Sequence, residues 1–340
     1  MRVLQAIAGA PHGGAEAFFE RLVVALAHAG EQQRLVIRRD AARAGRLRRA
    51  GMEVVELPFG GRLDLRTQPL MRRAIGEFAP DIVLTWMNRA SRLCPRGDFV
   101  HIGRLGGYYD LKYYKDCDHL IANTRDIAAY VVAAGWPEER VHYLPNFVAA
   151  EKAAPVPRAS LATPADAPLA LALGRLHRNK AFDVLIDGVA MVPRLHLWLA
   201  GEGEERPALE RRIAAAGIGD RVRLLGWRED VAALLAAADM LVSSSRHEPL
   251  GNVVIEAWAA GVAVVSTASE GPGALLRDGE TGLLVPVENA DALAAALARL
   301  AADAKLRATL GARGQAAFEA EFSEARVVAM YRDFFAAVKR

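Results

Sequence analysis

Cysteine is scarce in this chain of 340 residues, which has only Cys94 and Cys117. Two cysteines are too few for a disulfide framework in a protein of this length. Long apolar runs are missing too, since no stretch approaches the roughly 18–20 residues that cross a bilayer. The longest candidates are interrupted by Asp239 and Glu256. These absences exclude a small disulfide-rich secreted domain and a helical membrane protein, and they predict a cytoplasmic location.

The amino terminus carries the one feature that suggests secretion. Residues 1–10 are mostly apolar, as in a signal peptide, but the apolar part is short, contains Gln5 and runs straight into a glycine-rich turn at Pro11–Gly14. We interpret it as a buried first strand.

Composition predicts two folded domains. Hydrophobic residues make up 52% of the chain and charged residues 24%, which excludes wholesale disorder. Single cores stop growing near ~250–300 residues. The aperiodic segment 149–168, rich in proline and alanine, predicts a linker between domains at 1–148 and 169–322.

Short β-rich runs alternate with helix-period segments, such as Ala15–Ala29, on both sides of the linker. This alternation predicts an α/β protein of two doubly wound, Rossmann-like domains, each with a parallel sheet covered on both faces. Two such domains would face each other across a cleft at the carboxyl ends of their strands, where ligands bind in such folds. The expected strands are 3–8, 34–37, 53–57, 81–86, 99–103, 119–122, 140–144, 169–173, 195–200, 222–225, 240–243, 262–266 and 282–285.

Charge is concentrated near the amino terminus. The whole chain carries +3, whereas residues 34–73 hold 11 arginines against four acids. A solvated helical face explains this pattern, and so does a surface that binds the inner face of an anionic membrane. Nucleic acid is excluded as a partner, because Phe59 is the only aromatic residue in the segment and interleaved aromatics are typical of such surfaces.

The most informative stretch runs from Ser243 to Ser266, and it predicts a strand end, a loop, a helix at 252–260 and a further strand. Glu248 lies in the loop and Glu256 on the helix. Between them, the amides of Leu250, Gly251 and Asn252 would form a helix amino terminus, which attracts anions. A diphosphate between two carboxylates that accept hydroxyl hydrogen bonds fits this pattern, although an N-cap acid and a surface glutamate would also produce it.

A second stretch supplies cations. Gly174-Arg175-Leu176 ends a predicted strand and Lys180 opens the following helix. Two cations at that edge would meet the same diphosphate and neutralise a leaving phosphate.

Taken with Ala200–Gly203, Leu225–Trp227, Gly279–Pro286 and Gly13–Glu16, these two stretches resemble the family 4 retaining glycosyltransferases, which have the GT-B fold. The resemblance covers almost the whole chain. It implies a metal-independent enzyme without cofactors that moves a hexose from a UDP- or GDP-linked sugar to a glycolipid or glycan acceptor.

The resemblance also implies individual roles. Arg175 and Lys180 would hold the diphosphate next to Gly174 and the helix amides, Glu248 would contact the sugar hydroxyls, and Glu256 the ribose. The backbone of Trp227 and Arg228 would contact the base, and Gly14 the phosphate side from the first domain. The last helix, at 323–340, would pack on the first domain.

Residues 103–124 are similar to bacterial lipopolysaccharide core glycosyltransferases, which implies a phosphorylated glycolipid acceptor in cell-envelope glycan synthesis and a peripheral place at the inner membrane. Two features depart from the family pattern. Ala274 stands where a glutamate is expected, and the histidine common near the donor sugar has only His101 as a candidate, near Arg104. Asp116-Cys-Asp118 spells a metal motif of a different fold, and we read it as coincidence.

Three alternatives remain open. An oxidoreductase would use Gly201-Glu-Gly203, but Arg206 replaces the third glycine of the fingerprint. An epimerase or a phosphorylase would keep the fold and change the reaction, although a phosphorylase needs a longer chain. A degenerate partner subunit would bind a nucleotide sugar without turnover, which Ala274 keeps possible.

Overall fold

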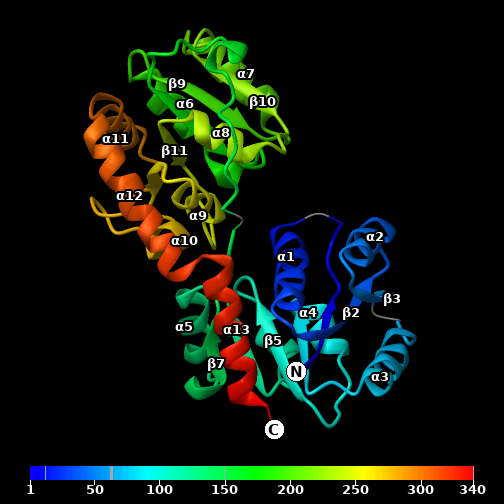
Figure 1. Ribbon diagram of the computed structural model, residues 1–340. Coiled ribbons are helices and arrows are strands. Elements are labelled where there is room, and N and C mark those ends of the chain that lie inside the picture. Colours follow the sequence, from blue (N-terminus) through cyan, green and yellow to red (C-terminus); the bar gives the residue numbers. More distant parts are fainter. Residues whose placement is uncertain (12, 62–63, 149, 340) are drawn as a thin grey trace. The chain divides into compact units, whose positions relative to one another are not determined.

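The computed structural model describes residues 1–11, 13–61, 64–148 and 150–339. The chain divides into two compact units (Figure 1): Met1–Phe147 with Glu324–Arg340, and Val148–Ser323. Five positions lie outside the described residues: 12 in the predicted turn, 62–63 in the basic segment, 149 in the predicted linker and 340 in the predicted last helix. Within the described part, no helix combines the length and the apolar character that a membrane span requires.

The first unit is built on a parallel sheet with strand order β3-β2-β1-β4-β5-β6-β7. The order reverses between β1 and β4, so this pair marks the switch point where doubly wound sheets bind ligands. Its strands are β1 (Arg2–Ile7), β2 (Gln32–Arg38), β3 (Glu53–Leu57), β4 (Ile82–Trp86), β5 (Val100–Leu105), β6 (His119–Ala122) and β7 (Val141–Tyr143). Its helices are α1 (Gly14–His28), α2 (Ala41–Arg49), α3 (Thr67–Phe78), α4 (Met87–Leu93), α5 (Arg125–Ala133) and α13 (Glu324–Val338).

The second unit repeats the plan with the order β10-β9-β8-β11-β12-β13, and its switch point lies between β8 and β11. Its strands are β8 (Leu169–Leu173), β9 (His196–Ala200), β10 (Val222–Gly226), β11 (Met240–Ser243), β12 (Ala263–Thr267) and β13 (Leu283–Val285). Its helices are α6 (Phe182–Ala190), α7 (Arg206–Ala215), α8 (Val231–Ala237), α9 (Asn252–Ala259), α10 (Glu270–Leu275), α11 (Ala290–Ala302) and α12 (Ala304–Glu321).

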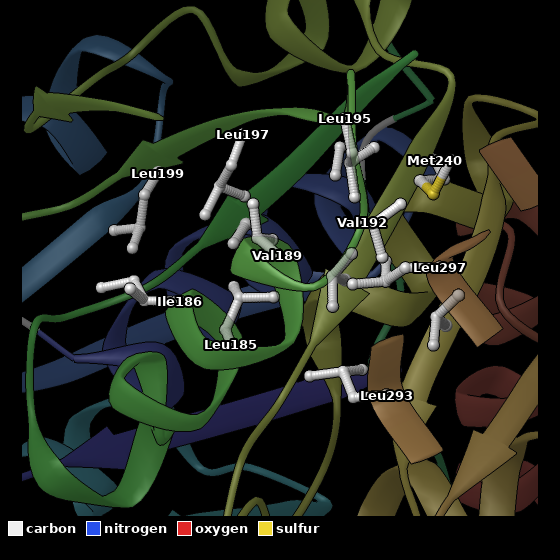
Figure 2. Close-up of a cluster of buried hydrophobic side chains, with 14 of the residues drawn as sticks. Leu185, Ile186, Val189, Val192, Leu195, Leu197, Leu199, Met240, Leu293 and Leu297 are labelled. Carbon is white, nitrogen blue, oxygen red and sulfur yellow. The ribbon is translucent and has the colours of Figure 1, made fainter. Parts of the chain in front are cut away.

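Alternating apolar residues give each sheet two buried faces. In β8, Ala170 and Ala172 join one core cluster, while Leu169 and Leu171 join another, as the period of two in a strand requires. Figure 2 shows part of the first cluster, in which side chains of α6 and α11 gather beside those of β9. Helices therefore cover both sheet faces, and the functional loops are left at the strand ends.

The last helix, α13, belongs to the first unit. Val327, Tyr331 and Phe335 are buried in the same core cluster as residues of α1, because the spacing of four residues places them on one helical face. The guanidinium of Arg104 on β5 donates a hydrogen bond of 2.9 Å to the hydroxyl of Tyr331.

The predicted fold class, two doubly wound α/β units, is confirmed, and every predicted strand is present with ends within two residues of those expected. Two local expectations differ from the structure. Lys180 does not open a helix, since it ends a short 3-10 turn (Arg178–Lys180) before α6. The described part of the predicted linker packs on the second unit, because Arg158 donates hydrogen bonds to the carbonyl of Ala237 and to Asp239.

Candidate active site

The candidate site of the second unit forms where β8 and β11 end, which is the switch point of that sheet. The loop after β8 carries Gly174, Arg175 and Lys180, and the loop after β11 carries Glu248 and leads into α9. Two segments about 70 residues apart in the sequence are therefore adjacent, because their strands are neighbours in the sheet.

Close backbone contacts fix the loop after β8. A Cβ atom at Gly201 would lie 1.8 Å from the carbonyl oxygen of Gly174, and one at Gly203 would lie 2.3 Å from that of Leu176. The loops hydrogen-bond through the amide of Leu176 and the carbonyl of Glu202, at 2.9 Å. The Gly-x-Gly segment thus lets two loops approach each other, which accounts for it without a dinucleotide.

Lys180 and Glu248 are brought together by this arrangement. The lysine side chain passes over Gly174, where an added Cβ would lie 3.0 Å from its Cε. Its ammonium forms an ion pair with the carboxylate of Glu248. Both side chains are partly buried, so the pair is screened less than one on the open surface.

Glu248 also lies at the amino terminus of α9. Its second carboxylate oxygen accepts a hydrogen bond of 3.3 Å from the amide of Gly251. Gly251 has a φ of +77°, a left-handed conformation that glycine adopts without strain. The predicted helix end is present, since α9 begins at Asn252 with Gly251 as its N-cap residue. A helix end of this kind has a partial positive charge, and here the Glu248 carboxylate occupies the Gly251 amide.

Two buried polar atoms near this helix end have no hydrogen-bond partner in the described residues: Oδ1 of Asn252 and Oγ of Ser269. Gly251 packs against Pro272 of α10, which follows Ser269. Buried polar atoms are normally satisfied by protein or water, so these two atoms have unused capacity for a polar ligand.

Glu270 and His247 belong to this site, although sequence reasoning passed over both. One carboxylate oxygen of Glu270 lies 2.5 Å from Nδ1 of His247, and the other accepts a hydrogen bond of 3.1 Å from the amide of Glu248. Burial raises the pKa of Glu270, but hydrogen bonds from backbone amides and His247 outweigh it and hold the pKa below its ordinary value. The sequence did contain a signal for Glu270. It begins the segment in which Ala274 stands where the family has a glutamate, so a carboxylate nearby was a candidate for the site.

Arg246 fastens the loop to the start of α6. Its guanidinium contacts the carboxylates of Asp183 and Glu288, at 2.7 and 2.5 Å. Its hydrogen bond to Asp183 is the main reason why its pKa is raised. The loop that carries Glu248 is therefore held on both sides.

Other predicted residues follow strands of the same sheet. Arg175 is exposed and pairs with Glu204 at 2.9 Å. Trp227, which follows β10, is 75% exposed, and Arg228 beside it pairs with Asp230. Glu256 is partly exposed on α9, one turn after Asn252.

His101 is a correction to the predicted catalytic set. It lies near the start of β5, four residues and about 13 Å before the carboxyl end of that strand. It is 5% exposed, and its ring contacts the Thr85 hydroxyl at 3.0 Å and the Asp116 carbonyl at 3.1 Å. Burial lowers its pKa. These contacts are those of a structural histidine at the edge opposite to the ligand edge.

Asp116 and Asp118, which spell the metal motif, also have structural partners. Asp116 pairs with Arg96, and Asp118 accepts a hydrogen bond from the amide of His101. Gly14, the predicted phosphate contact of the first unit, is the first residue of α1 and follows β1 at the switch point of the first sheet.

The basic segment at 34–73 is less uniform than its sequence suggests. Arg43 is buried, Arg46 pairs with Glu20, and Arg48 pairs with Glu56. Three arginines of α2 therefore have partners within the first unit, although Arg46 and Arg48 remain about half exposed.

This fold and site define a class of protein, and comparison with known proteins identifies it. Residues 167–303 match the family model described as "Glycosyl transferases group 1", and residues 12–152 match "Glycosyltransferase Family 4". The chain is 40% identical over 333 residues to the lipopolysaccharide core biosynthesis glycosyltransferase LpsE of Rhizobium meliloti (strain 1021), covering 95% of this chain and 96% of that protein. The chain belongs to the family 4 glycosyltransferases, which excludes the oxidoreductase.

Solved structures agree on the fold. A glycosyltransferase of Rickettsia africae is similar with a TM-score of 0.90 at 16% identity, over 99% of this chain and 98% of that one. HepE of Anabaena, solved in complex with UDP, is similar with a TM-score of 0.86 at 20% identity, over 99% and 100%. The predicted GT-B fold is confirmed.

Proposed function

We propose that this protein is a retaining, metal-independent hexosyltransferase that uses a nucleotide diphosphate sugar. The observation that carries the proposal is the cluster in which Lys180 and Glu248 meet at the amino terminus of α9. A cation, a carboxylate and the amides of a helix end in one place suit a donor that has both a diphosphate and hydroxyl groups.

The diphosphate would lie against the amides of α9, with Lys180 and Arg175 as its cations. Charge grows on the leaving phosphate as the glycosidic bond breaks, and fixed cations and amides stabilise that charge most in the transition state. Arg175 is held only by an exposed ion pair, which is worth little, so it can exchange Glu204 for a phosphate. These groups supply the positive charge for which other transferases use a metal ion.

Glu248 would accept hydrogen bonds from the sugar hydroxyls once Lys180 turns to the phosphate. Glu256 would bind the ribose, and the backbone at Trp227 and Arg228 the base. Glu270 would keep the Glu248 backbone in place through its hydrogen bond.

The acceptor is a glycolipid or glycan of the cell envelope, in lipopolysaccharide core synthesis. This part of the proposal rests on LpsE, which is named for that pathway and matches over 95% of the chain.

The face of α3 would bring the enzyme to the inner, anionic membrane surface on the cytoplasmic side. Leu65, just before α3, is 85% exposed, and Leu70 is exposed in the first turn of the helix. Arg66 and Arg73 are exposed beside Leu70, four residues before it and three residues after it. Leucines can insert among the acyl chains of a bilayer, and arginines can bind its anionic headgroups.

Thermal unfolding with UDP, GDP, ADP, CMP and NAD⁺, each near millimolar, tests the donor class. A ligand at ~100 times its dissociation constant stabilises by ~2.7 kcal/mol, which raises the midpoint by several degrees. We expect a shift with UDP or GDP. A shift with NAD⁺ alone would contradict the proposal, and nucleotide binding without transfer to any acceptor would favour the degenerate partner subunit. NMR of the product's anomeric configuration then decides whether the reaction is retaining.

A further inference from the structure

Arg43 is a buried charge that nothing in the proposed chemistry uses. It lies on α2 and is 1% exposed. Its guanidinium donates hydrogen bonds to the backbone carbonyls of Ala10 (2.9 Å) and Pro11 (3.1 Å). Glu20 and Asp40 hold it from the other side, at 3.0 and 3.4 Å. Burying a guanidinium is unfavourable unless partners compensate for its lost hydration, and here two of those partners are carbonyls of one loop.

That loop, which we call the glycine loop, comprises Gly9–Pro11, Gly13 and Gly14 among the described residues. A second buried charge holds it. Glu16 accepts a hydrogen bond of 2.7 Å from the amide of Ala10. Its carboxylate packs so closely that an added Cβ at Gly9 or Gly13 would lie 2.5 or 2.2 Å from it. An arginine thus holds the carbonyls of the loop, and a glutamate holds an amide.

The glycine loop follows β1, and the first sheet reverses its strand order between β1 and β4. Loops at such a switch point bind the ligand, and Gly14 is the residue assigned to the donor phosphate above. We infer that Arg43 is a positioning residue for sugar transfer, which fixes the glycine loop in the conformation that the donor requires. The inference rests on the proposed function.

The planar fork of arginine is what this geometry needs. One terminal nitrogen reaches two carbonyls while the others keep Glu20 and Asp40, and a lysine has no fixed fork with which to do so. Arg46 provides the internal contrast. It lies on the same helix and pairs with the same Glu20, yet it is half exposed and its hydrogen bonds go to that carboxylate.

The test compares Arg43→Gln with Arg46→Gln in the full chain. We expect Arg43→Gln to lower kcat/KM roughly 10- to 100-fold, because displacement of a positioning element by about 1 Å costs this much, while the dissociation constant of UDP or GDP changes less than about twofold. Arg46→Gln keeps its kcat/KM. Arg43→Lys recovers only part of the loss.

Hydrogen exchange of the peptide that contains Ala10 gives a readout independent of turnover. Arg43→Gln speeds its exchange and Arg46→Gln does not. Equal exchange in the two variants, or a wild-type kcat/KM for Arg43→Gln, overturns the inference. A wild type that transfers no sugar would instead refute the proposed function, and exchange would still decide what Arg43 does to the loop.

Discussion

The two units use charged residues at their switch points in opposite ways. In the second unit, the charges pair with one another at the rim of a helix end, as Lys180 does with Glu248. In the first unit, Arg43 and Glu16 are buried and bind backbone groups of the glycine loop, and Arg43 does so while it is also paired with Glu20 and Asp40. A partly exposed pair can exchange a protein partner for a ligand, whereas a buried charge that is bound to backbone groups holds the shape of the loop.

The difference also separates two kinds of mutational effect. Losing a partner from an exchangeable pair changes what the site can bind or stabilise. Losing a buried, backbone-bound charge leaves polar groups unsatisfied, which changes the shape of the loop. The contrast therefore predicts that substitutions in the second unit act on the chemistry, and those at Arg43 on its geometry.

The largest effect is expected for Glu248→Ala. Transfer should fall by at least roughly 10²–10³-fold, which is the order of the loss when a group that stabilises the transition state is removed. Binding of the nucleoside diphosphate should survive, because the amides of α9 and Lys180 remain. Steady-state kinetics and calorimetric titration with UDP or GDP measure the two quantities.

Glu288→Ala is the matched control, because it removes a carboxylate that touches the same loop through Arg246 and lies outside the proposed donor contacts. If Glu248→Ala lost nucleotide binding and transfer together, Glu248 would be a structural residue, and the contrast between the units would fail.

Sequence alone predicted every strand, because alternating apolar residues between turn signals specify buried parallel strands. It also predicted the helix end at Gly251, since glycine and the apolar run after it are local signals. It could not predict the pairing of Lys180 with Glu248 or the role of Glu270, because both depend on which strands become neighbours. His101 is a different case, because the predicted strand at 99–103 already placed it before the carboxyl end, and the structure adds its burial and its contacts with Thr85 and Asp116.

A smaller effect is expected on membrane binding, where the first unit has exposed arginines. Arg66→Ser with Arg73→Ser should weaken binding to vesicles that contain anionic lipid roughly 30-fold at low salt, because each arginine near such a surface contributes about 1 kcal/mol. Sedimentation with the vesicles measures the partition coefficient.

The control changes net charge equally in the other unit. Arg299→Ser with Arg313→Ser also removes two exposed arginines, and it should bind vesicles almost as the wild type does. Equal weakening of both double variants would show a response to net charge alone, and α3 would then be an ordinary solvated face.

The smallest effect concerns acid stability, which should differ between β7 with α13 in the first unit and α9 with α10 in the second. Nε2 of His142 on β7 lies 3.1 Å from Nδ1 of His119, and the His142 ring packs on Phe334 of α13. Burial, helped by His119, lowers the pKa of His142 to about 4. The unfolded chain then binds more protons between pH 4 and the ordinary histidine pKa of ~6.5, so the free energy of unfolding falls as the pH is lowered through this window.

We expect a loss of about 2 kcal/mol from His142 after allowance for screening at a half-buried ring. On α10 of the second unit, Glu270 has a pKa below its ordinary value, so its contribution is lost only at more acidic pH. Hydrogen exchange at pH 5, corrected for its intrinsic pH dependence, should therefore rise in α13 and β7 before α9 and α10.

His142→Phe should remove this early rise, because a phenyl ring cannot take up a proton beside Phe334. The control His28→Gln, at an exposed histidine, should keep the early rise. If exchange still rose early in His142→Phe, groups other than His142 would cause the acid sensitivity of the first unit, and the prediction would be wrong.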